Sequence, residues 1–288
     1  MSATRLRPKV TVYVPCHEYG RFVEECLASL ARQTLSDWEA VLIDDGSTDA
    51  TLSLLDAFRV RFPERVKVLS HTQPLGLRAC ANAALELATG DYVLRLDADD
   101  YLDENALLVL ASYLDTHPQV GLVYSNWTWI DEDGKVIGQE RRKRLWEEAK
   151  VPDLPAHGAC SMVRRRVLKA VGGYDPDLGA QDGHELWLRT LYRHGVASVE
   201  TPLFFYRQHG DSLSTDEARL LASRREIKRR AADSGRGPVK LRVAVVVPVK
   251  NSYAQTPGLA LLPLGDRTLL DHTLDSVAND PAWCGVLV

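Results

Sequence analysis

Three of the four residues from Asp97 to Asp100 are aspartates, and they directly follow the apolar run from Tyr92 to Leu96. Like charges held this close together repel one another unless a cation neutralises them. Mg²⁺ or Mn²⁺ can do so, because both ions prefer hard oxygen ligands and bridge to phosphate oxygens. The alternative is a solvated turn that caps the helix expected after Asp103. The position at the end of a buried strand favours the metal site.

A second acidic motif, residues 44–49 with the sequence Asp-Asp-Gly-Ser-Thr-Asp, also follows an apolar run. Thr48 or Asp49 could simply cap the helix that begins near Thr51, since both residue types are common N-caps. Asp44 and Asp45 could instead accept hydrogen bonds from a base N–H or a ribose hydroxyl. Two acidic strand ends in one sheet indicate a single ligand crevice.

The elements that would position these motifs alternate regularly along the first hundred residues. Strands are expected at residues 10–14, 39–43, 66–69 and 92–96, with helices at 21–32, from 51, and up to about 88. Strands that alternate with helices need crossover connections, so the predicted fold class is α/β with a mostly parallel sheet flanked by helices. Ligands of such sheets bind beyond the carboxyl ends of the strands.

Beyond residue 103 the pattern is less regular. Helices are expected at residues 107–114 and 186–192, strands at 120–125 and 203–206, and a turn at 131–134 between two extended segments. The charged run 140–150 is interpreted as a solvated helix or loop, with contact to an anionic acceptor as the alternative.

A break near residue 236 predicts two domains. A basic helical stretch at 217–232 ends in the sequence Asp-Ser-Gly-Arg-Gly-Pro at 233–238, and a new apolar strand is expected at 243–247. Sequences of this kind are typical of linkers. We therefore expect a large α/β domain at residues 1–235, a linker at 236–242 and a short, incomplete α/β fragment at 243–288.

The overall composition excludes several classes of protein. A net charge of −4 with 26% charged residues gives no support for nucleic-acid binding, which usually shows as a strongly basic domain. The five cysteines are scattered without a C-x-x-C pair, so we expect neither a zinc site nor a disulfide framework. Dispersed cysteines fit a reducing cytoplasm.

No membrane span is expected, because no run approaches the roughly 18 apolar residues that one requires. The basic stretch 224–230 is interpreted as a solvated helix face, with peripheral contact at the inner face of the membrane as the alternative. We therefore expect a cytoplasmic protein. The sequence does not indicate an oligomeric state.

Taken in order, the motifs of residues 9–215 resemble those of the family-2 glycosyltransferases of the GT-A fold. The resemblance rests on Val14-Pro15, the helix at 22–34, both acidic motifs, Gly172-Gly173-Tyr174-Asp175, the segment 182–189, and Tyr206-Arg207-Gln208-His209. It implies an inverting enzyme that moves a sugar from a nucleotide-sugar donor, with a UDP-sugar expected first, to a glycan or glycolipid acceptor. The expected process is surface polysaccharide or glycolipid biosynthesis.

The resemblance also implies a role for each motif residue. The nucleotide would contact Pro15, Asp44, Asp45, Asp97 and Arg207, and the ligands of Mn²⁺ or Mg²⁺ would be Asp97, Asp99 and His209. Such a metal neutralises the charge that builds up on the leaving nucleoside diphosphate. A core or strand-edge position is the alternative for His209.

Asp182 would be the general base that removes the proton of the acceptor hydroxyl. It begins the helix expected at 186–192, so its alternative role is that of an N-cap. Glu185 lies about one turn further on and is the competing base. Relatives usually have Glu-Asp followed by an aromatic residue here, whereas this chain has Gln181-Asp182-Gly183-His184-Glu185.

A second departure concerns residues 76–82, with the sequence Gly-Leu-Arg-Ala-Cys-Ala-Asn. Relatives commonly carry an arginine directly before Asn82, where this chain has Ala81. Either Arg78 reaches the nucleotide instead, or that contact is absent. The preference of the enzyme for one donor base depends on which of these holds.

The last 45 or so residues resemble the start of the sugar cytidylyltransferases, through the segments 243–249, 258–266 and 269–274. Lys250 is the one obvious phosphate partner, because the basic, glycine-rich phosphate loop of that family is missing. One strand, one loop and one helix cannot bury a core of their own, so we interpret this piece as a truncated or degenerate domain. Two other functions stay open, a non-catalytic binding module and a bifunctional protein that also performs sugar cytidylyltransfer.

Overall fold

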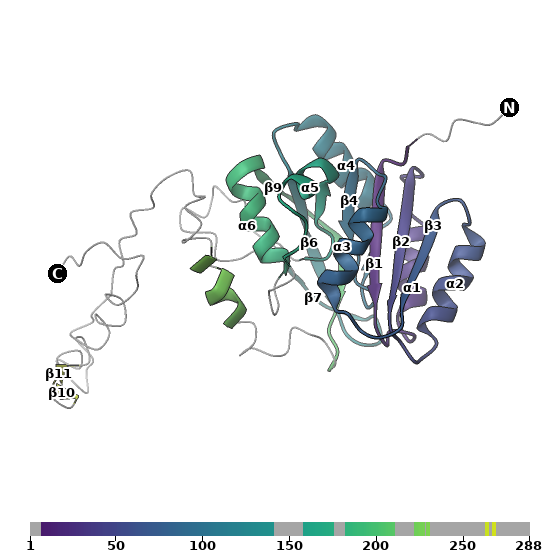
Figure 1. Cartoon of the computed structure of the whole chain (residues 1–288), viewed down its shortest axis with the longest axis horizontal. Helices are drawn as coiled ribbons and strands as arrows, with labels where there is room; N and C mark the ends of the chain where they lie inside the picture. The colour runs from purple at the N-terminus through teal and green to yellow at the C-terminus, as the bar shows by residue number, and fades with distance from the viewer. Residues whose placement is uncertain are drawn as a thin grey trace. The chain divides into compact units, whose positions relative to one another are not determined.

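The computed structural model describes residues 7–140, 158–175, 182–210, 222–227, 229–230, 263–264 and 267–268 (Figure 1). The chain divides into two compact units, Met1–Ile227 and Lys228–Val288. In the second unit the described strands are β10 (Pro263–Leu264) and β11 (Arg267–Thr268), which pair antiparallel. The predicted linker 236–242 and most of the fragment 243–288 lie outside the described residues, so the domain limits stay a prediction.

Strands and helices alternate from β1 to β4, as the sequence pattern predicts, and the order is irregular after that. The strands are β1 (Val10–Cys16), β2 (Trp38–Asp45), β3 (Val66–His71), β4 (Tyr92–Arg95), β5 (Tyr101–Leu102), β6 (Leu122–Ile130), β7 (Val136–Glu140), β8 (Met162–Arg164) and β9 (Val196–Arg207). The helices are α1 (Val23–Ala31), α2 (Thr51–Arg61), α3 (Leu77–Leu87), α4 (Ala106–Thr116), α5 (Arg165–Ala170) and α6 (Asp182–His194).

One sheet runs through the first unit in the order β3-β2-β1-β4-β8-β6-β9-β5, and β7 pairs with β6 at its side. The four strands β3, β2, β1 and β4 are parallel neighbours, as are β6 and β9. β8 lies between β4 and β6 and runs antiparallel to both. The predicted α/β class with a mostly parallel sheet flanked by helices is confirmed.

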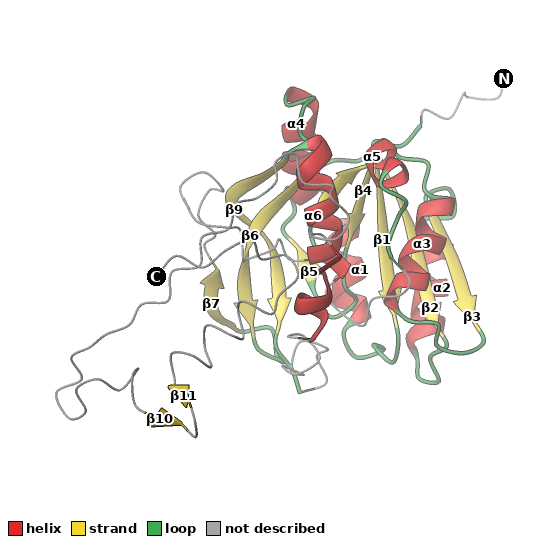
Figure 2. Cartoon of the chain, turned by 60° about the vertical axis from the view of Figure 1, so that its left-hand side comes forward, coloured by secondary structure: helices red, strands yellow, loops and turns green. Residues whose placement is uncertain are grey.

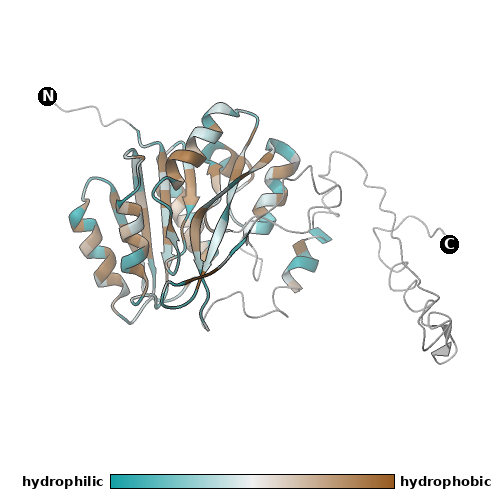
Figure 3. Ribbon diagram, turned by 180° about the vertical axis from the view of Figure 1, so that it is seen from behind, coloured by the Kyte–Doolittle hydropathy of each residue, from teal (hydrophilic) through white to brown (hydrophobic). Residues whose placement is uncertain are grey.

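Helices cover both faces of the sheet (Figure 2). Side chains alternate along a strand, so Val10, Val12 and Val14 of β1 enter one core cluster and Tyr13 enters the other. Residues of α1, α2 and α4 complete the first cluster, and residues of α3, α5 and α6 complete the second. The strands are accordingly mostly apolar, while the helices carry polar residues on their outer surfaces (Figure 3).

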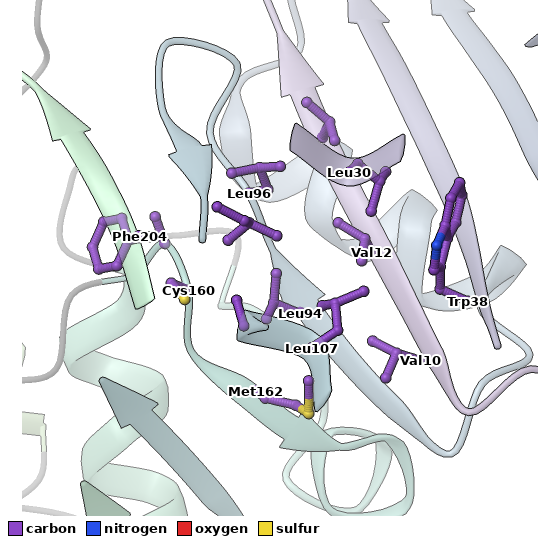
Figure 4. Packing of buried hydrophobic residues seen from close by; sticks show 14 of the residues in the cluster. Val10, Val12, Leu30, Trp38, Leu94, Leu96, Leu107, Cys160, Met162 and Phe204 are labelled. Carbon is purple, nitrogen blue, oxygen red and sulfur yellow. The ribbon is translucent and has the colours of Figure 1, made fainter. Parts of the chain in front are cut away.

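The first core cluster lies directly beneath the acidic run 97–100. Leu94 of β4, Met162 of β8 and Phe204 of β9 pack there with Leu107 of α4 (Figure 4). Burying a side chain of this kind contributes roughly 1.5–3 kcal/mol. Leu96 is fully buried in the same cluster, so the chain is anchored one residue before the acidic run begins.

Two strands are longer than predicted. The strand expected at 120–125 extends to Ile130, and the one expected at 203–206 starts at Val196. Polar residues and Pro202 interrupt the apolar pattern of β9, and shifts in its register with β6 near Asn126 absorb the interruption. The Asn126 side-chain amide donates to the carbonyl of Glu200 there. The short elements β5, β8 and α5 carry no periodic signal of their own and were not predicted.

Candidate active site at the carboxyl ends of the strands

Both acidic motifs lie at the carboxyl ends of parallel strands, on either side of the end of β1. Asp44 and Asp45 end β2, and the run 97–100 follows β4. β1 pairs with both of these strands, and its Pro15 lies opposite Ile43 of β2. The structure therefore brings Pro15 and the two motifs to one edge of the sheet, as the strand-end rule predicts.

Asp45 is held as a carboxylate by the loop that follows β3. It accepts hydrogen bonds from the backbone N–H groups of Leu75 (2.9 Å) and Gly76 (2.7 Å), and its Oδ1 lies 2.7 Å from Nδ1 of His71. Burial alone would raise the pKa of Asp45, but these hydrogen bonds outweigh it and lower that pKa. Asp45 is therefore ionised and can only accept hydrogen bonds.

Asp44 supports the turn after β2. Its carboxylate accepts hydrogen bonds from the Ser47 N–H (3.3 Å) and the Ser70 hydroxyl (3.0 Å), and the residue is 1% exposed. Gly46 adopts a φ of +73°, and a Cβ there would lie 2.7 Å from the backbone carbon of Gln73. The loop 73–76 thus packs directly on the glycine of the first motif.

Asp49 connects the start of α2 to the loop after β1. Its Oδ1 accepts from the Thr51 N–H (2.9 Å) and its Oδ2 from the Gly20 N–H (2.8 Å). Glu18 adds a second link, because its carboxylate accepts the Thr48 N–H at 2.7 Å. The loops that follow β1 and β2 are therefore fixed to each other.

The acidic run forms a compact group of oxygen ligands. Asp97, Asp99 and Asp100 each offer a carboxylate oxygen, and these oxygens lie within 4.8 Å of one another. Burial and the neighbouring Asp97 charge raise the pKa of Asp99, and burial with the charges of both neighbours raises the pKa of Asp100 well above its usual range. Ionising all three carboxylates together is therefore unfavourable without a cation, and their oxygen atoms are of the type that Mg²⁺ or Mn²⁺ prefers.

Each aspartate of the group also has its own protein partner. Arg95 binds the Asp97 carboxylate through Nε and Nη2, the latter at 2.9 Å. His209 Nε2 lies 2.9 Å from Oδ2 of Asp99. Oδ1 of Asp100 accepts the Arg207 N–H at 2.9 Å, whereas its buried Oδ2 has no partner among the described residues.

His209 is packed as well as hydrogen-bonded. Its ring centroid lies 5.1 Å from that of Phe22 and 6.2 Å from that of Tyr19, and the residue is 9% exposed. A histidine fixed next to Asp99 fits both a metal ligand and the alternative of a strand-edge residue that orients Asp99.

Arg207 is buried and makes its hydrogen bonds within the protein. Its side chain is 2% exposed, and Nε donates to the Asp99 carbonyl at 2.9 Å. Nη1 donates to the Glu132 carbonyl at 2.9 Å, and Nη2 binds the Glu25 carboxylate. These contacts give the guanidinium a positioning role that ties β9 to three other segments, and its contact with the nucleotide stays a prediction.

Arg78 lies in the first turn of α3, next to the loop that holds Asp45. Its Nε is buried and has no hydrogen-bond partner among the described residues. A buried guanidinium N–H without an acceptor is costly, so a ligand acceptor here would be stabilising. Its contact with the nucleotide stays a prediction.

Residues 11–172, more than half of the chain, match the family model described as "Glycosyl transferase family 2". The chain belongs to glycosyl transferase family 2. The observed elements agree with this assignment, since the match runs from β1 to α5 and includes both acidic motifs.

The curated relatives of this family 2 chain include two proteins that are named after the polysaccharide they help to make. The O-antigen biosynthesis protein RfbC of Myxococcus xanthus is 28% identical over 284 residues, which cover 93% of this chain and 22% of that protein. The chondroitin synthase of Escherichia coli is 26% identical over 65% of this chain and 27% of the synthase. The putative glycosyltransferase EpsE of Bacillus subtilis is 27% identical over 71% of this chain and 74% of that protein.

The family 2 chain therefore spans about a quarter of the length of the first two relatives. The match to RfbC is too long to be confined to residues 1–242, so it extends into the C-terminal part. The resemblance of that part to a cytidylyltransferase falls almost entirely outside the described residues and stays a prediction.

Solved structures share the fold. The crystal structure of S. aureus TarS 1-349 in complex with UDP-GlcNAc aligns with a TM-score of 0.64 at 21% identity, over 78% of this chain and 66% of that one. The mannosyltransferase PcManGT from Pyrobaculum calidifontis, in complex with GDP-Man and Mn²⁺, aligns with a TM-score of 0.60 at 21% identity, over 81% and 67% of the two chains. At this level of identity the likeness establishes the GT-A-like architecture.

The two predicted base residues have different surroundings. Asp182 is the first residue of α6, and the structure describes its backbone but not its side chain. Glu185 forms an ion pair with Arg189 one turn further along α6. Arg189 also donates to the carbonyls of Val171 and Gly173 (2.7 Å to the latter). Glu185 thus holds the arginine that fastens α6 to the Gly172-Gly173 turn.

Several contacts and residues of the site region were not predicted from the sequence. Tyr174, at the end of the same turn, shares a 2.8 Å hydroxyl hydrogen bond with Tyr13, and its backbone is bound on both sides by Asn82. Arg95 and His71 were also missed. His71 ends β3, so the strand-end rule could have found it, whereas nothing in the sequence spacing links Tyr13 to Tyr174.

No helix among the described residues has both the length and the apolar composition needed to cross a bilayer.

Proposed function

We propose that this chain is a metal-dependent, inverting glycosyltransferase that moves a sugar from a UDP-sugar to a hydroxyl group of a glycan or glycolipid in surface polysaccharide biosynthesis. The observation that carries the proposal is the position of Asp45 and of the 97–100 run on either side of the end of β1. The names of the relatives RfbC and chondroitin synthase support a polysaccharide or glycolipid acceptor.

The hydrogen-bonding state of Asp45 supports a uridine donor. Because ionised Asp45 can only accept, Nδ1 of His71 donates to it, and the carboxylate stays available as an acceptor for a base N–H. Uracil presents a ring N–H at the position where cytosine presents a bare nitrogen. Acceptors at this end of the crevice thus favour UDP over CDP, while Pro15 and Arg78 contact the rest of the nucleotide. TarS, one of the neighbouring folds, has been solved with UDP-GlcNAc.

Asp97, Asp99 and His209 would hold Mn²⁺ or Mg²⁺, which when bound supplies a positive charge next to the leaving diphosphate. The protein's part is to keep these ligands in place before the donor arrives. Arg95 fixes Asp97, and Arg207 fixes both the loop and the strand end that precedes His209. Ligands held in advance need no reorganisation when charge develops.

Asp182 is the general base in this proposal. It takes the proton of the acceptor hydroxyl while that oxygen attacks the anomeric carbon from the face opposite the nucleoside diphosphate, which inverts the configuration. Asp182 is the first residue of α6, and helix N-termini favour negatively charged groups. Glu185 orients Arg189 and has no proton-transfer role.

The test is a thermal-shift panel of UDP, GDP, CDP, CMP and dTDP, each with and without Mn²⁺. A ligand that binds only the folded state at a hundred times its Kd adds about 2.7 kcal/mol to the unfolding free energy. We expect UDP with Mn²⁺ to raise the melting temperature by several degrees, and CDP with Mn²⁺ to do so far less.

Two variants make the panel specific. Asp99→Asn should abolish the response to UDP with Mn²⁺, whereas Asp56→Asn, an exposed substitution on α2, should leave it unchanged. A folded wild-type protein that responds to no nucleotide with either metal would count against a transferase and for a non-catalytic module.

A further inference from the structure

A group of three side chains at the nucleoside end offers a set of donor atoms different from that of the acidic run. Asp45 at the end of β2, His71 at the end of β3 and Cys80 in α3 each offer one ligand atom, and these atoms lie within 4.8 Å of one another. Asp45 and His71 are register partners across β2 and β3. The three residues are far apart in sequence, so only the fold brings them together.

The donor types are carboxylate oxygen, imidazole nitrogen and sulfur. Zn²⁺ binds this combination, with bonds of about 2.0–2.3 Å that place two ligands of one ion roughly 3.3–3.7 Å apart. Mg²⁺ and Mn²⁺ select oxygen donors and do not favour a thiolate. Oδ1 of Asp45 and Nδ1 of His71 lie 2.7 Å apart, so these two atoms must separate by roughly 1 Å or less to share one ion.

The surroundings hold these ligands in place. Asp45 keeps its two hydrogen bonds from the backbone of Leu75 and Gly76, which orient the carboxylate from outside the group. Cys80 is 1% exposed and its thiol is close to Asp45, while the His71 side chain is 15% exposed. His71 therefore provides the side of the group that is open to solvent.

We propose that Asp45, His71 and Cys80 form a second metal site, specific for thiophilic divalent cations such as Zn²⁺ and separate from the acidic run. Binding replaces the Asp45–His71 hydrogen bond by two metal bonds. The proton of Nδ1 moves to Nε2 by a change of tautomer, and the thiol proton is released to solvent. One carboxylate and one thiolate then balance the two charges of the ion.

The site has a consequence for the donor. If Asp45 and His71 contact the base, as the proposed function has it, an ion bound to the same two side chains excludes the nucleotide. Zn²⁺ then acts as a competitive inhibitor with respect to the nucleotide, whereas Mn²⁺ at the acidic run assists binding. The claim that Zn²⁺ competes with the nucleotide rests on the proposed function, but the existence of the metal site does not.

Co²⁺ is the probe, because Co²⁺ bound to a thiolate gives a charge-transfer absorption that Co²⁺ bound to oxygen and nitrogen does not. Among the described residues the other candidate metal group is Asp97, Asp99 and Asp100, which contains no sulfur. Titration of the full, reduced chain with Co²⁺ should give this absorption at one equivalent, and Zn²⁺ should abolish it by displacement. Absence of the absorption in a folded protein would overturn the proposal.

Four variants assign the signal. Cys80→Ser should abolish it, and His71→Asn, which keeps every cysteine, should weaken Co²⁺ binding at least about tenfold. Asp99→Asn changes the acidic run, and Cys284→Ser removes another cysteine. Neither substitution should change the Co²⁺–thiolate absorption. A signal that survives in Cys80→Ser, or disappears in Cys284→Ser, would overturn the assignment. If Cys80→Ser does not fold, His71→Asn decides.

A final titration separates the two claims. UDP with Mg²⁺ should suppress the Co²⁺–thiolate absorption, and UDP should do so only if it also raises the melting temperature. A protein stabilised by UDP that keeps the full absorption would overturn the competition. A protein with the absorption but no response to any nucleotide would confirm the metal site and contradict the proposed function instead.

Discussion

Asp182 and Glu185 lie one turn apart on α6 but are expected to respond differently to the loss of charge. Asp182→Asn should lower kcat by about 10²–10⁴-fold with little change in melting temperature, because a general base contributes that much. Glu185→Gln should instead lower the melting temperature, because it weakens the ion pair with Arg189. Steady-state release of nucleoside diphosphate and thermal unfolding of both variants measure the two effects.

The reverse pattern would exchange the two roles. A large loss of kcat in Glu185→Gln, with a stable fold and an active Asp182→Asn, would make Glu185 the base. Equal losses of kcat in both variants would contradict the assignment of the general base to Asp182 and of a structural role to Glu185.

Glu39 is a buried carboxylate whose contribution to stability depends on pH. It accepts hydrogen bonds from the Thr89 N–H (2.6 Å) and from the hydroxyls of Thr11 and Thr89 (2.8 Å each), and Lys67 lies 3.3 Å away. Burial alone would raise the pKa of Glu39, but these contacts outweigh it and lower that pKa. Its stabilisation is therefore complete above the unfolded pKa of about 4.3 and is lost as pH falls through the lower folded value.

Glu39→Gln should consequently cost about 1–2 kcal/mol of unfolding free energy at pH 7, and progressively less below pH ~4. Urea denaturation of both proteins across this range measures the difference. An exposed control, Glu86→Gln on α3, should be close to neutral across the same pH range. A cost for Glu39→Gln that stays constant with pH would show that shape, and not charge, is what Glu39 provides.

At the scale of elements, Arg207 connects β9 to α1, the acidic run and the β6–β7 turn. Arg207→Lys keeps the charge but loses the planar set of donors, so several buried carbonyls lose their partners. We expect a loss of about 2–4 kcal/mol in stability and an increase of roughly 10–100-fold in the half-saturating Mn²⁺ concentration. Thermal unfolding and a Mn²⁺ titration in the presence of UDP measure the two.

Arg59→Lys is the control, since Arg59 also pairs with a carboxylate, that of Asp56 on α2, but is 47% exposed. It should change stability by less than about 1 kcal/mol and leave the Mn²⁺ titration unchanged. If the two substitutions changed stability and the Mn²⁺ titration equally, Arg207 would have no special positioning role.

The contact between the first acidic motif and the loop 73–76 can be tested with two glycines. Gly46 and Gly76 both have positive φ, of +73° and +89°. A Cβ at Gly46 would meet backbone atoms at 2.7–2.9 Å, whereas a Cβ at Gly76 would meet nothing within 4 Å. Gly76→Ala should therefore cost only the conformational strain of about 1–3 kcal/mol.

Gly46→Ala should lower stability by that strain and, in addition, by the clash with the loop 73–76. It should also weaken UDP binding, because this loop provides two of the N–H groups that donate to Asp45. Thermal unfolding with and without UDP separates the two effects. If both variants lost equal stability and equal affinity, the packing of the loop on Gly46 would have no part in the site.

For the molecule as a whole, the sequence predicts periodic elements and the residues at strand ends. β1 to β4 and the helices between them were predicted within a few residues, because apolar runs and amphipathic stretches alternate there. The acidic motifs were placed correctly at strand ends for the same reason. Asp45 and Asp99 could thus be selected from the sequence alone, while their supporting residues could not.

The parts of the site that the sequence does not predict depend on contacts between segments that are distant along the chain. Arg207 was expected at the nucleotide because it stands next to His209, but its side chain turns inward to carbonyls of the β6–β7 turn. The absence of a C-x-x-C pair argued against a zinc site, yet folding places Cys80 next to Asp45 and His71. Neither arrangement can be predicted from the spacing of residues along the chain.

The insertion of β8 between β4 and β6 has a consequence for how the chain is made. A ribosome releases both acidic motifs long before it releases Met162–Arg164, so the nascent sheet ends at β4 with an open edge for the intervening time. The unpaired edge of a sheet can pair with strands of other chains. A ribosome adds only about 5–20 residues per second, so this edge stays open for seconds. Chaperone protection of this edge during translation would therefore matter most after the acidic run has emerged and before β8 closes over β4.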